Sequence, residues 1–586
     1  MSLLVTTVES EYMKLFLKII TVAMITASAF AQLTTDQKTS DFLNVVAVYD
    51  KNYGPYEWKR DVLGFDLLNV APWLDKVSAT KNDLDFYEVM VSYIASLNDA
   101  HDGYTLPSNF AARLNFGVDI YDGKLLVDTI NRTRLPVAEF PFLIGYELVG
   151  IDGKDAQQTL DGLLQYQTAG NSRSTRRLAA QLLTTRPQIL MPHAADVPEI
   201  STVVFRRPDG NLEAYRIPWT KSGLLLTNIG KYSTPTAMRV LKAGVATGEE
   251  GTPEPEEPER IPEYMAPLLK LWNCQLPDRA VNGFGSQSPI FTASLPSGFT
   301  QRLGRAAADV FFSGVFEAKG YKIGFIRIPD FAPANTTLAL TTFQREIDFF
   351  NSSTDGLIVD VMRNPGGSGS YLNQIVSLLI PTTWRSIAFE VRATSTWVAD
   401  ISIAYEQAKA QGAPQSILNL LLAIKSEIVA ANRANRGRTK PIPLDDVVID
   451  RDPATDLTGK VIAYNKPIMT LVDELSASAG DAFAATLQDN ARGPLFGWRT
   501  MGAGGSVVGG AAGSYSLGFM TLTESLMVRK NPVVTSDYPT APYVENIGVR
   551  PEIQVEYMTR DNLIQNGKPF VDAFVAAMAD HIGRSK

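Results

Sequence analysis

The stretch from Pro467 to Asn490 most constrains what this chain can fold into. Its apolar run from Ile468 to Val472 is too short for a helix. A Ser-rich turn follows, and then an Ala-rich segment whose larger apolar residues have helical spacing. The pattern predicts a buried strand, a turn and a helix, with Ser478 at the start of the helix.

Ser478 has two interpretations at that position. Backbone N–H groups at a helix N-terminus point outward and the helix dipole favours negative charge, so an oxyanion forming beside Ser478 would meet ready donors. Ser478 and Asp481 also fit a capping box in which Asp replaces the usual Glu or Gln. Taken alone, the turn favours the cap over a nucleophile.

Two further segments change that balance. A buried-looking strand from Gly356 runs into the Gly-rich loop that contains Asp360 to Gly367, and a third segment runs from Val544 to Ile553. Together with Ser476-Ala477-Ser478, these segments resemble, in order, the core motifs of the tail-specific or C-terminal-processing serine peptidases of family S41. The resemblance covers residues 320 to 557, with Arg363 one place later than in the family pattern. It implies an α/β core of the ClpP/crotonase-like type within a multidomain protein.

The commonest branch of that family carries a Lys base after the nucleophile helix, but the equivalent stretch here, Thr500 to Gly504, contains no Lys. Serine needs a partner to take its proton. The resemblance to the His-using, tricorn-like branch implies that His101 is the base, that Glu545 orients it and that Ser478 is the nucleophile. The alternatives are a helix-dipole role for His101, an exposed loop acid at Glu545, and Lys530 as the base.

The resemblance also implies an oxyanion hole. In the family, one N–H group comes from the Gly-Gly loop and one from the residue after the nucleophile, which here are Gly366 or Gly367 and Ala479. Glycine suits a backbone that approaches a reacting carbonyl closely. A tight strand-to-helix turn also favours Gly, so this inference depends on Ser478.

Residues 1–31 have a basic start at Met13-Lys14, a short apolar run and an Ala-Phe-Ala end, which predicts a secretory signal cleaved before Gln32. Met13 is the more natural start. We therefore expect an exported protein, periplasmic or secreted, with no membrane contact after signal removal. The single cysteine, Cys274, excludes an internal disulfide.

The remaining chain divides by composition and motif. Residues 32–108 predict a helical domain that ends near His101, and residues 112–220 resemble a PDZ-like, β-rich domain. In the latter, Phe116 and Gly117 would bind a peptide carboxylate, with a generic small β domain as the alternative. The other expected segments are an acidic, Pro-rich linker at 244–264, a core at 311–557 with a helical insertion at about 385–453, and a C-terminal helix at 558–586.

The sequence therefore predicts an exported serine endopeptidase acting on peptides or unfolded protein tails. The alternative is an inactive S41-like protein that binds peptides or lipophiles. The formal charge of −8 and the absence of a basic tract argue against nucleic acid as a partner. We expect neither a metal nor another cofactor, because no ligand cluster or nucleotide loop occurs in the sequence. The oligomeric state stays open.

Overall fold

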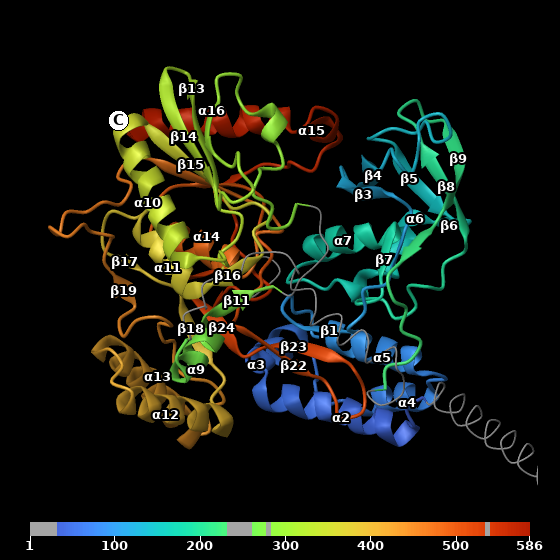
Figure 1. The fold of residues 1–586 in the computed structure, drawn as a ribbon, viewed down its shortest axis with the longest axis horizontal. Helices are drawn as coiled ribbons and strands as arrows, with labels where there is room; N and C mark the ends of the chain where they lie inside the picture. Colours follow the sequence, from blue (N-terminus) through green and yellow to red (C-terminus); the bar gives the residue numbers. More distant parts are fainter. Residues whose placement is uncertain (1–31, 231–260, 277–282, 534–539, 586) are drawn as a thin grey trace, which may run out of the picture.

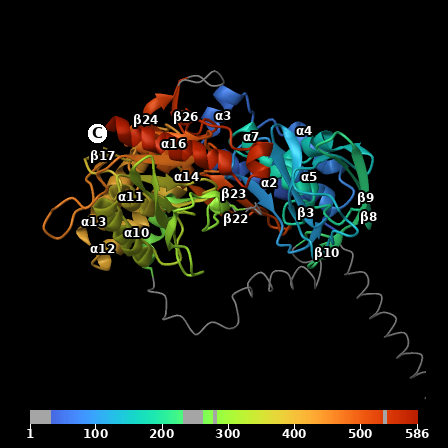
Figure 2. The same cartoon turned by 90° about the horizontal axis from the view of Figure 1, so that it is seen from above.

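The computed structural model describes residues 32–230, 261–276, 283–533 and 540–585. The expected signal segment and most of the expected acidic linker lie outside these ranges. Figure 1 shows a lobe that contains the large central sheet, a second lobe formed by a smaller sheet, and a layer of N-terminal helices below both. In the view of Figure 2 the two lobes lie side by side.

The core sheet has seven strands in the order β12-β13-β14-β15-β20-β21-β26. Strands β14, β15, β20, β21 and β26 are parallel, and the β12-β13-β14 end is antiparallel. Both predicted motif strands belong to it, and every residue in them is buried because helices cover both faces of the sheet. The strands are β12 Thr300–Leu303, β13 Phe312–Ala318, β14 Tyr321–Arg327, β15 Gly356–Asp360, β20 Ile468–Val472, β21 Leu495–Gly497 and β26 Ile553–Gln554.

Two helix layers cover this sheet. On one face a cluster of buried side chains joins the sheet to α10, α11 and α14. On the other face a second cluster joins the sheet to α16. The sequence predicts one C-terminal helix over 558–586, whereas the structure has two, separated by a turn at Asn566 and Gly567, which both have positive φ. The helices are α10 Thr336–Ser353, α11 Gly369–Ser377, α14 Ala479–Asp489, α15 Arg560–Ile564 and α16 Lys568–Ser585.

The second lobe holds a six-stranded antiparallel sheet in which β3 is an edge strand. Its own buried cluster includes a stack of Phe142 on Phe205, with ring centroids 4.6 Å apart. The elements are β3 Phe116–Tyr121, β4 Lys124–Ile130, β5 Glu147–Ile151, β6 Lys154–Asp155, β8 Ile200–Arg206, β9 Leu212–Pro218, α6 Ala156–Asp161 and α7 Ser172–Ala180.

The N-terminal helices pack directly on the core. Strand β1 pairs with β23, and Asp41 accepts hydrogen bonds from the backbone N–H groups of residues 514–516. These contacts join segments more than 400 residues apart in the sequence. The elements are α2 Thr35–Asn52, α3 Tyr56–Leu63, α4 Ala71–Ala79, α5 Asp83–Ala95, β1 Gly103–Thr105, β22 Val507–Ala511 and β23 Phe519–Thr523.

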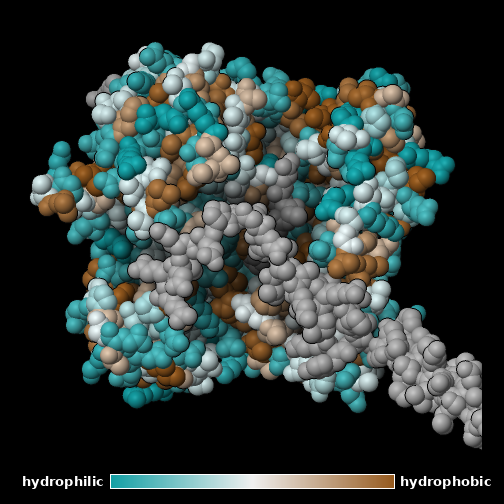
Figure 3. All heavy atoms as spheres, viewed as in Figure 1, coloured by the Kyte–Doolittle hydropathy of each residue, from teal (hydrophilic) through white to brown (hydrophobic). Residues whose placement is uncertain are grey.

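The expected insertion contains α12 Ser395–Ala410 and α13 Gln415–Arg433, which pack on each other. Strand β18, Ala388–Val391, pairs with β24, Ser525–Val533, and so attaches the insertion to the core. Arg392 and Arg438 both form ion pairs with Glu57 of α3. The insertion therefore connects the core to the helical layer. On the face drawn in Figure 3, hydrophobic residues lie scattered among hydrophilic ones.

Candidate active site

Ser478 is held at the turn between β20 and α14, as the sequence predicts. Its backbone has φ 58° and ψ −113°, a region that costs an L-residue on the order of 1–3 kcal/mol and persists only when the surroundings enforce it. Asp481 provides part of that enforcement, because its carboxylate accepts the Ser478 N–H at 2.8 Å. The hydrogen bond that the capping box predicts, from the Ser478 N–H to the Asp481 carboxylate, is therefore present.

The Ser478 side chain faces a histidine from another domain. The distance from Ser478 Oγ to His101 Nε2 is 2.7 Å, and both residues are fully buried. Helix α5 ends at Ala95, so His101 lies in the loop before β1 and not at the helix terminus. The alternative of a helix-dipole partner is thus wrong. A hydroxyl and an imidazole at this distance can exchange a proton.

The loop around His101 is fixed by its own backbone. His101 N–H donates to Asp99 Oδ1 at 2.9 Å, and the His101 carbonyl accepts from Thr521 Oγ1 at 2.6 Å. Because Thr521 belongs to β23, the pairing of β1 with β23 sets the position of the imidazole.

Asp481 also ties the nucleophile turn to the loop that follows α14. Besides Ser478, its carboxylate accepts the N–H groups of Gly502 and Ala503 and the hydroxyl of Thr500. Burial raises the pKa of Asp481 to about 6, although these four hydrogen bonds act in the opposite direction. The stretch that lacks the family Lys therefore binds a carboxylate through neutral donors.

Glu545 is fully buried, so the exposed-acid alternative is wrong. Its Oε1 accepts from Lys59 Nζ at 2.5 Å and its Oε2 accepts from Gly504 N–H at 2.8 Å. Burial and the nearby Asp99 raise the pKa of Glu545 to about 7, while Lys59 opposes that rise. The expected role of Glu545 in orienting His101 stays a prediction.

Lys59 is the cation of this cluster and was not expected from the sequence. It is fully buried on α3, and its ammonium also donates to Asn546 Oδ1 at 2.6 Å and to the Asn98 carbonyl at 2.9 Å. The ammonium thus joins the segment before His101 to the segment that carries Glu545. No local pattern around Lys59 could have indicated this, because its partners lie elsewhere in the chain.

Asp99 and Asp102 complete the buried charges beside His101. Asp99 accepts from the Tyr53 hydroxyl at 2.8 Å, and Asp102 accepts from Thr523 N–H at 3.0 Å. Burial and the neighbouring Asp99 raise the pKa of Asp102 well above its ordinary value. Their closeness to His101 in sequence was a usable signal, since two acids flank the expected base.

The Gly-Gly loop lies directly against the nucleophile. A Cβ atom on Gly366, whose φ is +97°, would come within 2.8 Å of Ser478 Cβ and 2.9 Å of Ala479 N. The Gly366 N–H donates to Asn364 Oδ1 at 2.9 Å and is used there. Ala479 is the first residue of α14, where N–H groups have no acceptor within the helix.

A short strand covers this loop. Strand β11, Asn273–Gln275, pairs antiparallel with β16, Gly366–Ser368, and aligns Cys274 with Gly367. Leu276 follows β11 and packs in the same apolar cluster as Ala100, Ala477 and Ala503. Strand β11 lies on the side of the loop that adjoins the nucleophile, since a Cβ on Gly366 would clash with the Cys274 carbonyl oxygen and would be 2.8 Å from Ser478 Cβ. A substrate backbone can pair with β16 only after β11 moves away.

Arginines of α7 fix the second lobe next to the nucleophile strand. Arg177 binds Asp119 at 2.6 Å and Glu474 at 2.9 Å, and Arg173 binds Glu474 at 2.7 Å. Burial alone would raise the pKa of Glu474, but Arg177 and Arg173 hold it below its ordinary value. Glu474 lies four residues before Ser478. These ion pairs therefore anchor the second lobe close to Ser478.

The expected carboxylate-binding residues lie elsewhere in this lobe. Phe116 and Gly117 begin the edge strand β3 and pair with β4, so they are in a strand and not in a loop. They line a groove of about 460 Å³ together with Gln181 and Thr184. Lys530 is exposed in strand β24, and its neighbour Arg529 is buried against Asp489.

The structure describes residues 32–230, 261–276, 283–533 and 540–585. In that part of the chain, no helix is both long and apolar enough to cross a membrane. The same residues contain no group of three or more His, Cys, Asp or Glu side chains placed to hold a metal ion.

Comparison with known proteins agrees with the fold and the domain content. Residues 322–554 match the model of peptidase family S41, and residues 111–227 match a PDZ domain. A protein of Chlamydia pneumoniae is 25% identical over 593 residues, spanning 92% of this chain and 90% of that protein. A Chlamydia trachomatis protein is 25% identical over 570 residues, spanning 89% and 88%. The fold resembles that of mature CPAF complexed with lactacystin, with a TM-score of 0.69, 22% identity and coverage of 93% and 99%.

The protein is thus a serine-type peptidase. More particularly, it is a multidomain chain of mixed helix and sheet that carries an S41 peptidase domain and a PDZ domain. The predicted resemblance is confirmed at this level.

Proposed function

We propose that this protein is an exported serine endopeptidase of the His-using, tricorn-like S41 branch that cleaves peptides or unfolded protein tails. Ser478 is the nucleophile, His101 the general base and Glu545 the acid that supports the base. The observation that carries the proposal is the 2.7 Å distance from His101 Nε2 to Ser478 Oγ. The core is proposed to be of the ClpP/crotonase type.

The chemistry follows from this pair. Neutral His101 takes the proton of Ser478 as the hydroxyl attacks the scissile carbonyl, and then passes it to the leaving amine. Water repeats the cycle to release the acyl group. The negative charge of Glu545 stabilises the imidazolium formed in each half.

The oxyanion is proposed to bind at the predicted loop and helix start. Ala479 N–H supplies one donor from the N-terminus of α14. The other comes from the Gly366-Gly367 loop. Gly366 N–H is directed at Asn364 and Gly367 is paired with Cys274 of β11, so this second donor becomes available only when one of these contacts is released.

The PDZ domain is proposed to capture the carboxyl end of a substrate beside Phe116 and Gly117. Edge strand β3 can add a peptide strand, and the adjoining groove can take its last side chain. The N-terminal signal supports export. Neither nucleic acid nor a membrane surface is among the proposed partners.

A second candidate is the non-catalytic binding protein. The full burial of Ser478 and His101, together with the pairing of β11 on the glycine loop, favours it, because a binder needs no access to the serine. The peptidase is supported by the alignment of the serine and imidazole, which a site without selection for catalysis has no reason to keep within hydrogen-bond distance.

Labelling with a fluorophosphonate tests the choice. The probe should modify Ser478 over time as β11 leaves β16, and Ser478→Ala should lose labelling while keeping its melting temperature. Lys530→Ala is the matched control and should label normally. Equal labelling of the Ser478→Ala variant would refute the nucleophile, and no labelling of a folded wild type under any condition would favour the binding protein.

A further inference from the structure

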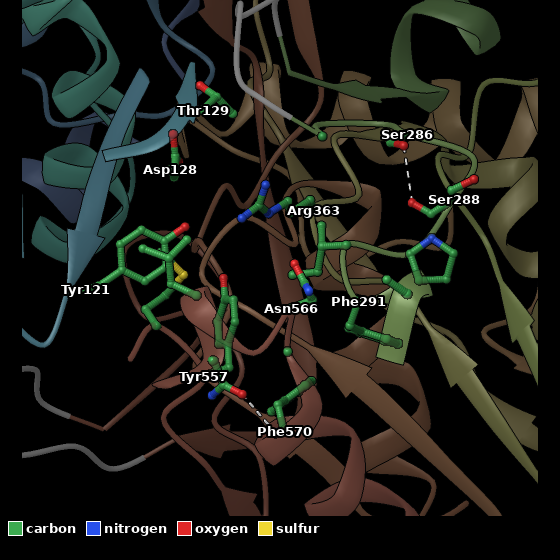
Figure 4. A pocket seen from close by; sticks show the side chains of 18 of the residues that line it. Tyr121, Asp128, Thr129, Ser286, Ser288, Phe291, Arg363, Tyr557, Asn566 and Phe570 are labelled. Atoms are coloured by element: carbon green, nitrogen blue, oxygen red, sulfur yellow. Dashed lines mark hydrogen bonds between the residues drawn. The ribbon is translucent and has the colours of Figure 1, made fainter. Parts of the chain in front are cut away.

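A cavity of about 410 Å³ lies where the PDZ domain, the peptidase core and the C-terminal segment meet (Figure 4). Its walls come from the β3 and β4 strands, from residues 283–293, from the Arg363 loop and from residues 557–570. Cavities of this size at domain interfaces are typical places for small ligands. Ser478 and His101 are not among its lining residues, so it is separate from the proposed catalytic pair.

One end of the cavity carries opposite charges. In Figure 4 the Arg363 guanidinium lies near the centre of the opening, with Asp128 and Thr129 on the PDZ side. Gly283, with φ +72°, lets the backbone approach so closely that a Cβ there would lie 3.1 Å from Arg363 Nη1. Because this guanidinium is packed and largely buried, it has less freedom to lose on binding than an exposed arginine would have.

Asp128 supplies the matching acid. Burial and the nearby Asp119 raise its pKa to about 6, while Arg363 and Arg177 act in the opposite direction. Arg177 itself is engaged by Asp119 and Glu474. Tyr121 also lines the cavity. At neutral pH the charged end therefore presents both a guanidinium and a carboxylate.

The other end is apolar. Phe291 and Phe570 pack with ring centroids 5.8 Å apart and are each 2% exposed, so the apolar surface open to a ligand comes from Ile290, Leu563 and Ile144. Ile144 and Ile290 are 47% and 37% exposed, which is high for isoleucine at a domain junction. An apolar wall beside paired charges suits a ligand with an apolar side chain and two charged termini.

We propose that this cavity binds short peptides that have a free carboxylate, a free ammonium group and an apolar side chain. Arg363 takes the carboxylate, Asp128 takes the ammonium group, and the apolar surface of Ile144, Ile290 and Leu563 takes the side chain. Arg363 directly precedes Asn364, whose side chain holds the Gly366 N–H. A bound peptide thus contacts the residue next to the glycine loop. The proposal does not depend on Ser478 chemistry.

Calorimetric titration of the full chain with the dipeptide Leu-Phe tests the site. The Ser478→Ala background prevents turnover. N-acetyl-Leu-Phe lacks the ammonium group and Leu-Phe-amide lacks the carboxylate, so each should bind about tenfold more weakly or worse. Equal binding of the three peptides would overturn the assignment, and so would equally tight binding of decanoate, a carboxylate without an ammonium group.

Variants locate the binding. Ile144→Trp should fill the apolar end and abolish binding, whereas Ile200→Trp, at an equally exposed isoleucine of the same domain, should leave it unchanged. Arg363→Gln should weaken Leu-Phe but should not affect the already weak binding of the amide. Retained binding in folded Ile144→Trp protein would refute the site even if Arg363→Gln failed to fold.

The pH dependence gives an independent check. A peptide ammonium group, with a pKa near about 8, stays charged from pH 7 down to pH 5. Asp128 protonates across that range, so Leu-Phe affinity should fall with pH. Asp128→Asn should bind weakly and show a flat profile. An unchanged slope in Asp128→Asn would contradict the role of this acid.

Discussion

The two sides of the Ser478–His101 pair are built in different ways. On the serine side, Asp481 binds neutral donors from its own helix start and from residues 500–503. On the histidine side, Glu545 accepts from the ammonium of Lys59 and lies near Asp99, and these residues come from the helical layer and the core. The serine side is thus a local turn, whereas the histidine side exists only when two parts of the chain dock.

The difference teaches where each kind of interaction belongs. Neutral N–H donors compensate a buried carboxylate while keeping a turn rigid, and they need only a short loop. A buried ion pair supplies a stronger field but carries a large desolvation cost. Here the Lys59 ammonium also donates to the Asn98 carbonyl, which ties the ion pair to the segment three residues before the proposed base.

Removing the base should have the largest effect. His101→Ala eliminates the group that takes the Ser478 proton, so kcat should fall by roughly 10⁴- to 10⁶-fold with little change in stability. Steady-state peptide hydrolysis and a urea melt measure the two quantities. Lys530→Ala should be nearly silent. An active His101→Ala enzyme with an inactive Lys530→Ala enzyme would return the chain to the Lys-using branch.

Removing the cation should have the next largest effect. Lys59→Met leaves Glu545 buried without its ion pair, so its pKa should rise beyond about 7 and its charge should be lost at neutral pH. We expect kcat/KM to fall on the order of 10²-fold at pH 7 and its acid limb to move to higher pH.

Lys38→Met is the matched control for Lys59→Met. Lys38 is also buried in the helical layer, but it lies beside Asp83, away from Ser478. The Lys38→Met variant should lower the free energy of unfolding without moving the pH profile of kcat/KM. If both variants shift the acid limb equally, the effect of Lys59 is structural and not electrostatic.

Changing the acid on the serine side should mainly affect stability. Asp481→Asn places an amide NH₂ among N–H donors, so we expect a loss of about 3 kcal/mol in the free energy of unfolding. Burial raises the pKa of Asp481 from 3.8 in the unfolded chain to about 6 in the folded one. The protonated carboxyl therefore adds to the free energy of unfolding, fully so below the unfolded pKa, and this contribution is lost as pH rises through about 6.

Urea melts between about pH 4 and pH 7 should therefore show a shallower decline for Asp481→Asn than for the wild type. Asp580→Asn, at an exposed acid, should retain the wild-type slope. Identical slopes for Asp481→Asn and the wild type would show that Asp481 does not titrate in this range.

The smallest effect concerns β11, the strand that pairs with the glycine loop. Burial raises the pKa of the Cys274 thiol to about 12, so the thiol should react slowly with a disulfide reagent in the closed form. Leu276→Ser weakens the packing of the segment after β11 and should accelerate both Cys274 modification and Ser478 labelling several-fold. Independent changes in the two rates would show that β11 does not control access.

Much of the site could be predicted from local patterns. The strand at 468–472, the turn at Ser478 and the helix after it lie where the sequence places them, because apolar runs and turn residues act over a few neighbours. The missing Lys in 500–504 directed attention to His101, whose Nε2 lies 2.7 Å from Ser478 Oγ. The boundary of α5 was less accurate, since the pattern could not show that the chain leaves the helix at Ala95.

By itself, the sequence determined a buried strand, turn and helix around Ser478, a Gly-rich loop for the proposed oxyanion and a histidine available as a base. Only the tertiary structure decided that His101 faces Ser478 at 2.7 Å, that Lys59 forms an ion pair with Glu545, and that β11 pairs with the glycine-loop strand β16. The physical reason is range. Turns and periodicity act between neighbours in sequence, whereas an ion pair between Lys59 and Glu545 depends on docking residues 486 positions apart.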